Sequence, residues 1–303
     1  MTGADERIAP DPLSETRRRY ARKIMTIAGV DDAAIETAFA TVPREAFLPP
    51  GPWMVSGFGP MGGIGPTPDA DPGHLYNDAL VAIDAGRGLN NGQPSLHARM
   101  IKALAPKPGD TLIHVGAGMG YYTAILATLT APDGHVHGIE VVRDLAEAAE
   151  RCLARAGYET ATVTHGDAAT LPVDIADDIY VNAGVGMVEP HWLRTLSAGG
   201  RLVMPLTIEP DIAGRLPRWG RVLVVAAQET SADTGVYAAW FEDPVAFVGC
   251  VGHRSRVQDE RLAQAVRSGD IAQLRSVRLG PDPAIDADCL VPGDGWWLSA
   301  AAP

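Results

Sequence analysis

The chain has 303 residues and a net charge of -12, and 46% of its residues are hydrophobic while 20% are charged. This length and apolar content suffice for one large core with an appended lobe, so we expect one or two domains. The acidic balance, with no block of Lys and Arg among aromatics, argues against a nucleic-acid partner. No apolar run reaches the ~18 residues of a membrane span, and the polar N-terminus lacks an apolar signal core, which together predict a cytoplasmic protein without a membrane partner.

The three cysteines are widely spaced and none belongs to a C-x-x-C arrangement, which argues against a disulfide framework or a zinc site. They are Cys152, Cys250 and Cys289. His135 and His137 alternate along one predicted strand without a nearby third ligand. We therefore expect no metal.

The N-terminal quarter predicts helices followed by a long irregular loop. Apolar residues recur at helical spacing over 14–42, with an interruption around Asp31. From 49 to 73 the chain is dense in Gly and Pro, which predicts an ordered irregular loop, with a disordered linker as the alternative. The side chains expected to anchor this loop are Trp53, Met54 and Phe58. We assign residues 1–75 to this first unit.

Helix and strand signals alternate between residues 93 and 206. The predicted strands cover 111–115, 135–140, 160–164, 178–182 and 201–206. The predicted helices cover 94–104, 121–129, 144–156 and 189–196, the last closed by Ala198-Gly199-Gly200. Strands separated by helices predict a parallel, doubly wound α/β sheet of the Rossmann-like kind, which we assign to residues 76–210.

The remaining residues, 211–303, predict a smaller C-terminal α+β lobe. Strand-like runs at 221–227 and 236–241 precede a polar helix near 258–267. We expect the strand pair to extend the sheet and a cap to lie near the C-terminus. Trp296 and Trp297 are expected to be core residues.

The strand at 111–115 leads directly into Gly116-Ala117-Gly118-Met119-Gly120, which opens the next helix. Such a turn lets the backbone pass close to a ligand and presents N–H groups at a helix N-terminus. A dinucleotide site more typically reads G-x-G-x-x-G, and residue 121 is Tyr here, which disfavours NAD. The alternative is a tight turn that binds nothing.

Two acidic residues follow the next two strands. Glu140 ends the second strand, where it can accept hydrogen bonds from both ribose hydroxyls of a nucleoside. Asp167, followed by Ala168, comes after the third strand, where its carboxylate can accept from an adenine amino group. The alternatives are a solvated strand-end carboxylate for Glu140 and a turn cap for Asp167. In register with the glycine turn, these residues favour a nucleoside pocket.

This combination resembles the S-adenosylmethionine site of a class I methyltransferase. More specifically, residues 40–206 resemble the protein-L-isoaspartate O-methyltransferase family through an ordered set of motifs. These are V-P-R-E-A-F-L-P at 42–49, Y-N-D at 76–78, K-P-G-D at 107–110 and A-G-G-R-L-V at 198–203. The resemblance implies S-adenosylmethionine as the cofactor, bound by His97, Gly116, Ala117, Gly118, Gly120, Glu140, Asp167 and Ala168. For His97, an exposed or core histidine is the alternative.

The segment Asn90-Asn91-Gly92-Gln93-Pro94 departs from the T-I-S-[QA]-P pattern of that family. Gly92 stands where the family has a Ser whose hydroxyl helps to hold the substrate carboxylate, and the Asn amides can supply replacement donors. The resemblance places catalytic residues at Asn91, Gly92 and Gln93. It places substrate-binding residues at Tyr76, Asp78, Asn90 and Asn182. Asn182 replaces the Thr of the family's V-T-A, and an internally satisfied buried Asn is its alternative.

The resemblance implies a carboxyl O-methyltransferase that acts on L-isoaspartyl or aspartyl residues of a protein or peptide. Because a carboxylate is ionised at neutral pH, its methylation depends on positioning rather than on an acid–base dyad. Three alternatives stay open. They are a methyltransferase dedicated to one peptide natural-product precursor or other small carboxylate, a non-catalytic S-adenosylmethionine-binding homologue and, with least support, a nicotinamide oxidoreductase.

Overall fold

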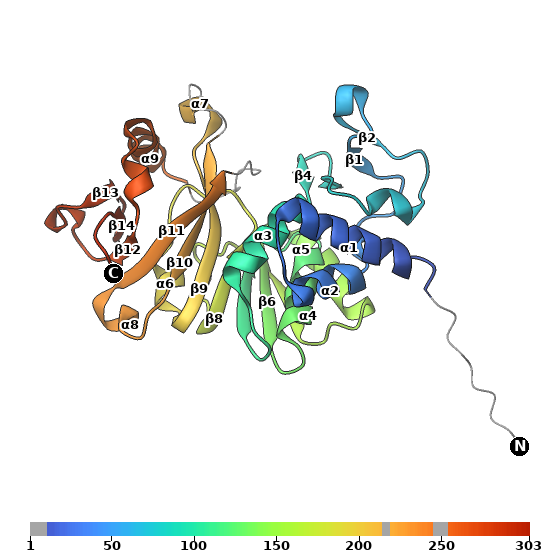
Figure 1. Ribbon diagram of the computed structural model, residues 1–303, viewed down its shortest axis with the longest axis horizontal. Helices are drawn as coiled ribbons and strands as arrows, with labels where there is room; N and C mark the ends of the chain where they lie inside the picture. The colour runs from blue at the N-terminus through green and yellow to red at the C-terminus, as the bar shows by residue number, and fades with distance from the viewer. Residues whose placement is uncertain (1–10, 214–218, 245–253) are drawn as a thin grey trace, which may run out of the picture.

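The computed structural model describes residues 11–213, 219–244 and 254–303, so Cys250 lies outside the described residues. Its largest element is a ten-stranded mixed sheet in the order β13-β14-β12-β11-β10-β9-β8-β5-β6-β7 (Figure 1). No helix among the described residues is both long and apolar enough to cross a bilayer.

One half of this sheet is parallel, and helices connect most of its strands. The strands are β5 (Thr111–Val115), β6 (His135–Glu140), β7 (Ala161–His165), β8 (Ala176–Val181) and β9 (Leu196–Thr207). The helices are α3 (Pro94–Leu104), α4 (Tyr121–Thr130), α5 (Arg143–Arg155) and α6 (Pro190–Arg194). This arrangement confirms the predicted doubly wound α/β fold, in which the order of β7, β6, β5, β8 and β9 reverses beside β5.

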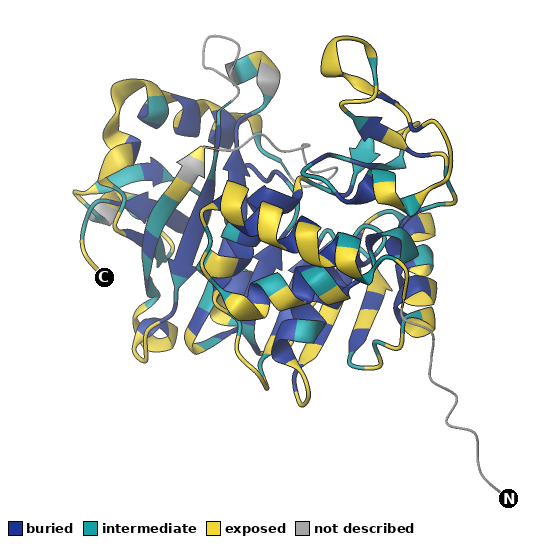
Figure 2. Ribbon diagram, turned by 45° about the vertical axis from the view of Figure 1, so that its right-hand side comes forward, coloured by how far each residue is buried: buried dark blue, intermediate teal, exposed yellow. Residues whose placement is uncertain are grey.

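Successive residues of each central strand face opposite sides of the sheet, as β geometry requires. Leu112 of β5 packs into the core beneath α3, α4 and α5, while Ile113 packs into the core that includes α6. In β8, Tyr180 packs into the same core as Leu112, and Ile179 packs into the same core as Ile113. The buried strands therefore lie between two layers. The helices of these layers are exposed on their outward sides (Figure 2).

The helix predicted at 189–196 is shorter than expected, and its predicted stop is wrong. α6 ends at Arg194, and β9 begins at Leu196 and contains Ala198-Gly199-Gly200. Gly199 has φ +85°, and a Cβ on Gly200 would overlap the backbone of Asp177. The glycines thus allow an irregular strand to lie close to β8, a role that local sequence does not distinguish from a helix stop.

The N-terminal helical segment is two helices, α1 (Ser14–Ala28) and α2 (Ala33–Thr41). Gly29 ends α1 in the left-handed region at φ +66°. Asp32 caps α2 by accepting from the backbone N–H groups of Ala34 and Ile35.

The Gly- and Pro-rich segment is ordered but only partly anchored as predicted. It contains η1 (Arg44–Phe47), β1 (Met54–Ser56), η2 (Pro60–Gly62), β2 (Ile64–Pro66) and η3 (Pro72–Leu75), followed by the hairpin of β3 (Ala82–Asp84) and β4 (Leu89–Asn90). Trp53 is buried, and its Nε1 donates to Pro49 O at 2.7 Å. Met54 and Phe58 are exposed at 36% and 38%, so the prediction that they anchor the loop is wrong. A bridge between Val55 and Val81 instead joins this segment to the residue just before β3.

The C-terminal residues continue the sheet with antiparallel strands. These are β10 (Gly220–Ala226), β11 (Val236–Pro244), β12 (Ser276–Leu279), β13 (Cys289–Pro292) and β14 (Trp296–Ser299). The helical elements are α7 (Pro210–Ala213), α8 (Ser231–Thr234), α9 (Arg256–Ser268), η4 (Asp270–Gln273) and η5 (Pro283–Ile285). The sheet therefore extends further than the predicted strand pair.

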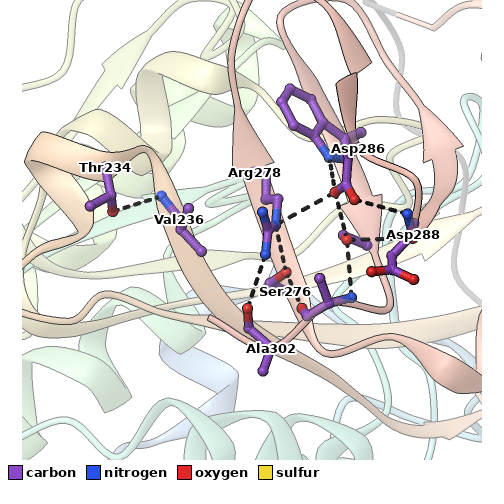
Figure 3. Close-up of polar contacts among 10 residues, drawn as sticks. Thr234, Val236, Ser276, Arg278, Asp286, Asp288 and Ala302 are labelled. Carbon is purple, nitrogen blue, oxygen red and sulfur yellow. Dashed lines mark hydrogen bonds and ion pairs between the residues drawn. The ribbon is translucent and has the colours of Figure 1, made fainter. Parts of the chain in front are cut away.

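A polar cluster holds the end of the chain against β12 and β14 (Figure 3). Asp286 Oδ2 accepts from Trp297 Nε1 and from Ser299 Oγ, both at 2.7 Å. Arg278 Nη2 donates to Ala302 O at 2.9 Å. Trp296 and Trp297 are both buried, as predicted.

Candidate active site

A cleft opens at the carboxyl ends of β5, β6, β7 and β8, where ligands bind in doubly wound folds. It holds roughly 1200 Å³ of space, open solvent included. Four segments at the ends of these strands form part of its wall. They are Gly116–Met119, Glu140–Val142, Gly166–Ala169 and the run that contains Asn182, Ala183, Val185 and Met187.

The glycine turn lies against two other parts of the cleft. Gly116 has φ +79°, and a Cβ there would lie 3.0 Å from Asn182 O. Gly118 has φ +55°, and a Cβ there would lie 3.1 Å from Ile83 Cδ1. Only glycine permits both the left-handed backbone and this approach. Gly120 is the N-cap of α4 and packs against α5 outside the cleft wall, so its predicted cofactor contact stays a prediction.

Glu140 joins the glycine turn to the end of β6. Its Oε2 accepts from Gly118 N at 2.8 Å, and its Oε1 accepts from Val142 N at 2.9 Å. The side chain lines the cleft with 6% exposure, and this burial raises the pKa of the carboxyl above its ordinary value. Each carboxylate oxygen has a second lone pair, so Glu140 can still accept from a pair of ribose hydroxyls.

Asp167 both caps a turn and lines the cleft. Its Oδ1 accepts from Ala169 N at 3.0 Å, which is the turn cap that the sequence offered as an alternative. The carbonyl of neighbouring Ala168 accepts from Trp192 Nε1 at 3.0 Å, which fixes this segment to α6. Asp167 and Ala168 thus lie in the wall at a fixed position.

Asn90 and Asn91 also line the cleft, from β4 and the residue after it. Asn91 is 6% exposed, and its Oδ1 accepts from Arg44 Nη2 at 3.0 Å and from Val81 N at 3.2 Å. Its Nδ2 has no hydrogen-bond partner within the described part of the chain. A buried amide donor in a cleft wall can therefore be satisfied by a bound acceptor group.

Four other predicted residues lie outside the cleft wall. Asp78 caps α3, since its carboxylate accepts from Ser95 N, from Ser95 Oγ and from Gln93 Nε2 at 2.7 to 2.8 Å. The Tyr76 hydroxyl donates to Glu45. Gly92 N donates to Asn90 Oδ1 at 2.9 Å, in the turn that precedes α3. The catalytic roles of Gly92 and Gln93 and the substrate-binding roles of Tyr76 and Asp78 stay predictions.

His97 is fully buried behind the wall rather than in it. Its ring stacks on Tyr122, which lines the cleft, with centroids 3.7 Å apart. Its Nδ1 shares a hydrogen bond of 2.5 Å with the Tyr180 hydroxyl. Burial lowers the pKa of His97 well below its ordinary value, so the imidazole is neutral. Its predicted cofactor contact stays a prediction.

Most of the apolar wall and the burial of one cation were not predictable from the sequence pattern. Several apolar and aromatic residues of the wall carry no charge or motif that would mark them in the sequence. They are Phe47, Ile83, Leu89, Tyr121, Tyr122, Leu145 and Trp192. Arg44 is completely buried and donates to Leu75 O and Ala79 O, each at 2.7 Å, as well as to Asn91. The V-P-R motif at 42–44 was the available signal for Arg44.

The polar groups and the glycine turn of the cleft fit S-adenosylmethionine. A buried carboxylate lies at the end of the second strand, a second carboxylate at the end of the third, and a close-packed glycine turn between β5 and α4. The fold and the cleft together define a class I S-adenosylmethionine-dependent methyltransferase.

Comparison with known proteins narrows this class. Residues 68–218 match the model of the family described as Protein-L-isoaspartate(D-aspartate) O-methyltransferase (PCMT). The chain is 30% identical over 201 residues to a protein-L-isoaspartate O-methyltransferase of Ignicoccus hospitalis, covering 65% of this chain and 85% of that one. It is 34% identical over 206 residues to the protein of that name from Methylorubrum extorquens, covering 67% and 79%. The chain belongs to the protein-L-isoaspartate O-methyltransferase family.

Two solved structures share the fold across most of the chain. A structure named protein-L-isoaspartate O-methyltransferase aligns with a TM-score of 0.62 and 20% identity, over 94% of this chain and 88% of that one. A Plasmodium falciparum structure provisionally named for the same enzyme, in complex with S-adenosyl-L-homocysteine, aligns with a TM-score of 0.59 and 18% identity, over 78% and 99%. The first alignment extends the shared fold into the C-terminal lobe.

Proposed function

We propose that this chain transfers the methyl group of S-adenosylmethionine to the carboxylate of L-isoaspartyl, or aspartyl, residues in proteins or peptides. One observation carries the proposal. The carboxylate of Glu140 and the amide of Asn91 line one cleft, in a chain of the protein-L-isoaspartate O-methyltransferase family. A nucleoside and a carboxylate can thus be bound in the same cleft.

Glu140, Asp167 and the glycine turn would hold the cofactor. Glu140 accepts from the ribose hydroxyls, Asp167 accepts from the adenine amino group, and the turn at Gly116–Gly118 allows close backbone approach. When bound, S-adenosylmethionine supplies a methyl group already activated by its sulfonium. The protein therefore needs to fix the relative position of two groups, which can lower a barrier by on the order of 7 to 11 kcal/mol.

Asn91 would position the acceptor. Arg44 and Val81 both donate to its Oδ1, so the orientation of the amide is fixed and Nδ2 is left as a donor. An acceptor carboxylate bound by Nδ2 keeps its other oxygen free to attack the methyl carbon. No proton has to be removed, because the acceptor is ionised at neutral pH.

Methylation assays with defined peptides test this function. We expect methyl incorporation into an L-isoaspartyl peptide, and binding of S-adenosyl-L-homocysteine by calorimetry. Binding without incorporation into any isoaspartyl or aspartyl peptide would overturn the acceptor assignment but keep the cofactor assignment. Absence of both would overturn the function altogether.

A methyltransferase dedicated to one peptide or other small carboxylate is the second candidate. The observation that favours it is the environment of Gly92, where the family has Ser. A Cβ on Gly92 would lie 2.7 Å from His97 Cδ2 and closer still to Nε2, so the imidazole occupies the space of the missing side chain. Turnover of one sequence context with none on a generic isoaspartyl peptide would favour this candidate.

A further inference from the structure

The run from Asn182 to Met187 is a wall of the cleft built from loop backbone. Asn182, Ala183, Val185 and Met187 line the cleft. Val185 N donates to Pro205 O at 3.0 Å, and Thr207 N donates to Val185 O at 2.8 Å, so the loop is attached to the end of β9. Because a Cβ on Gly116 would already lie 3.0 Å from Asn182 O, a shift of this wall would also disturb the glycine turn.

Arg254 binds this wall from the C-terminal lobe. Its Nη1 donates to Gly184 O at 3.0 Å and to Thr207 Oγ1 at 3.1 Å, and its Nη2 donates to Thr207 O at 2.8 Å. Gly184 lies between the two wall residues Ala183 and Val185. The rigid fork of a guanidinium suits this role, since it fixes several acceptors relative to one another.

Two carboxylates hold the Arg254 guanidinium in place. Its Nη2 donates to Asp259 Oδ1 at 2.9 Å, and its Nε lies 2.8 Å from Glu209 Oε1. Asp259 lies in the first turn of α9 with 1% exposure, and Arg254 has an 11% exposed side chain. The ion pair of Arg254 and Asp259 is therefore shielded from solvent, and its position depends on how α9 packs.

Gly186 allows α9 to approach the wall. A Cβ on Gly186 would lie 2.9 Å from Asp259 Oδ1 and 3.3 Å from Arg254 Nη2. Beyond this contact, Leu262 and Ala263 of α9 belong to the same buried core as Val185. The C-terminal lobe thus contacts the wall through both a polar and an apolar surface.

We propose that Arg254, oriented by Asp259, is a positioning residue for the cleft: it holds the Ala183–Val185 wall in the conformation that binds the cofactor and the acceptor. Residues beyond 218, where the family match ends, then help to fix the conformation of the site. This inference rests on the proposed function for the identity of the ligand, but its structural part does not.

The experiment compares Arg254→Met, Arg254→Lys and the control Arg261→Met in the full chain. Arg261 lies on α9 and donates to Pro292 O, away from the wall. Hydrogen exchange reports the protection of the Val185 and Thr207 amides, and calorimetry reports the affinity for S-adenosyl-L-homocysteine. We expect Arg254→Met to raise both exchange rates and weaken the affinity at least tenfold. Arg261→Met should change each less than twofold.

Arg254→Lys should retain the folded state but not the protection of the wall, because a compact ammonium cannot span the acceptors that Nη1 and Nη2 bind separately. If Arg254→Met fails to fold, Arg254→Lys and the double variant Arg254→Met/Asp259→Asn supply the same readouts. The double variant leaves no unpaired buried carboxylate, because the remaining partner, Glu209, has a 40% exposed side chain. Unchanged exchange and affinity in a folded Arg254 variant would overturn the proposal. If the unsubstituted protein binds no S-adenosyl-L-homocysteine, the proposed function fails, while the exchange rates still decide whether Arg254 holds the wall.

Discussion

Arg44 Nη2 donates to Asn91 Oδ1 at 3.0 Å, and this bond links the completely buried arginine of the V-P-R motif to the cleft wall. The position of Asn91 corresponds to Ile in the T-I-S pattern that the sequence resembles. This chain uses a buried cation to orient an amide in the cleft wall.

Replacing Asn91 tests whether its amide positions the acceptor. We expect Asn91→Ile to lower kcat/KM for an isoaspartyl peptide by about 10- to 100-fold, the value of one hydrogen bond to a charged group. Asn91→Asp keeps the oxygen that Arg44 binds but loses the donor, so it should lose activity as well. Affinity for S-adenosyl-L-homocysteine, measured by calorimetry, should change less than threefold in both variants. Full activity of Asn91→Asp would refute the role of Nδ2.

Replacing Glu140 tests the cofactor side of the cleft. In Glu140→Gln an amide group must face the Gly118 or Val142 N–H, both of which now donate to the carboxylate. We expect a loss of about 1 to 3 kcal/mol in binding of S-adenosylmethionine, or roughly 5- to 150-fold in Kd by calorimetry. The exposed Glu147→Gln on α5 is the matched control and should bind normally. Equal affinities of the two variants would exclude Glu140 from the binding site.

The packing of Gly92 against His97 predicts a coupled pair. Gly92→Ser should destabilise the protein both through the backbone at φ +75° and through overlap with the imidazole. Gly88→Ser in the β3–β4 turn, at φ +71° with open space around it, carries the backbone cost alone and should destabilise less. In urea unfolding, the double variant Gly92→Ser/His97→Ala should be more stable than the sum of the single changes by about 1 kcal/mol or more. Strict additivity would show that the overlap relaxes without cost.

Asp178 predicts a pH dependence of stability. Burial raises the pKa of this carboxyl from 3.8 to about 7, although Arg201 N donates to it at 2.8 Å. The folded state thus binds more protons than the unfolded state between pH ~4 and ~7, so the free energy of unfolding should fall as pH rises through this range and then level off. The decline is at most roughly 4 kcal/mol.

Urea unfolding of Asp178→Asn across this pH range measures the effect. The variant keeps an oxygen that can accept from Arg201 N and has no titrating group, so its decline should be smaller. Asp133→Asn, in an exposed turn, should retain the decline of the unsubstituted protein. Parallel curves for all three proteins would contradict the assignment to Asp178.

The fold was predictable because its strongest signals are local. Strand β5, the glycine turn and α4 occupy consecutive residues, and Glu140 and Asp167 follow the next two strands directly. The rule that parallel strands share a carboxyl edge then places these residues in one cleft. The C-terminal boundary of α6 was wrong, because glycine serves equally in a helix stop and in an irregular strand such as β9.

The parts that could not be predicted depend on contacts distant in sequence. Arg44 reaches Asn91 across 47 positions, and Arg254 reaches Gly184 across 70. The V-P-R motif marks Arg44 but does not indicate its partners. Arg254 has no local signature, because a buried arginine has the same neighbours in sequence as one in solvent. Likewise, nothing near Phe58 indicates that its ring stays 38% exposed while Trp53 is buried.

The pairing of β9 with β10 has a further consequence for the chain as a whole. Residues 201–207 of β9 pair antiparallel with 220–226 of β10, and most of these β9 residues are buried. A chain cut near residue 210 would therefore expose an apolar strand edge with unpaired N–H and C=O groups, a template for another copy to add to. Strand β10 thus covers an apolar edge that β9 would otherwise present to a second copy.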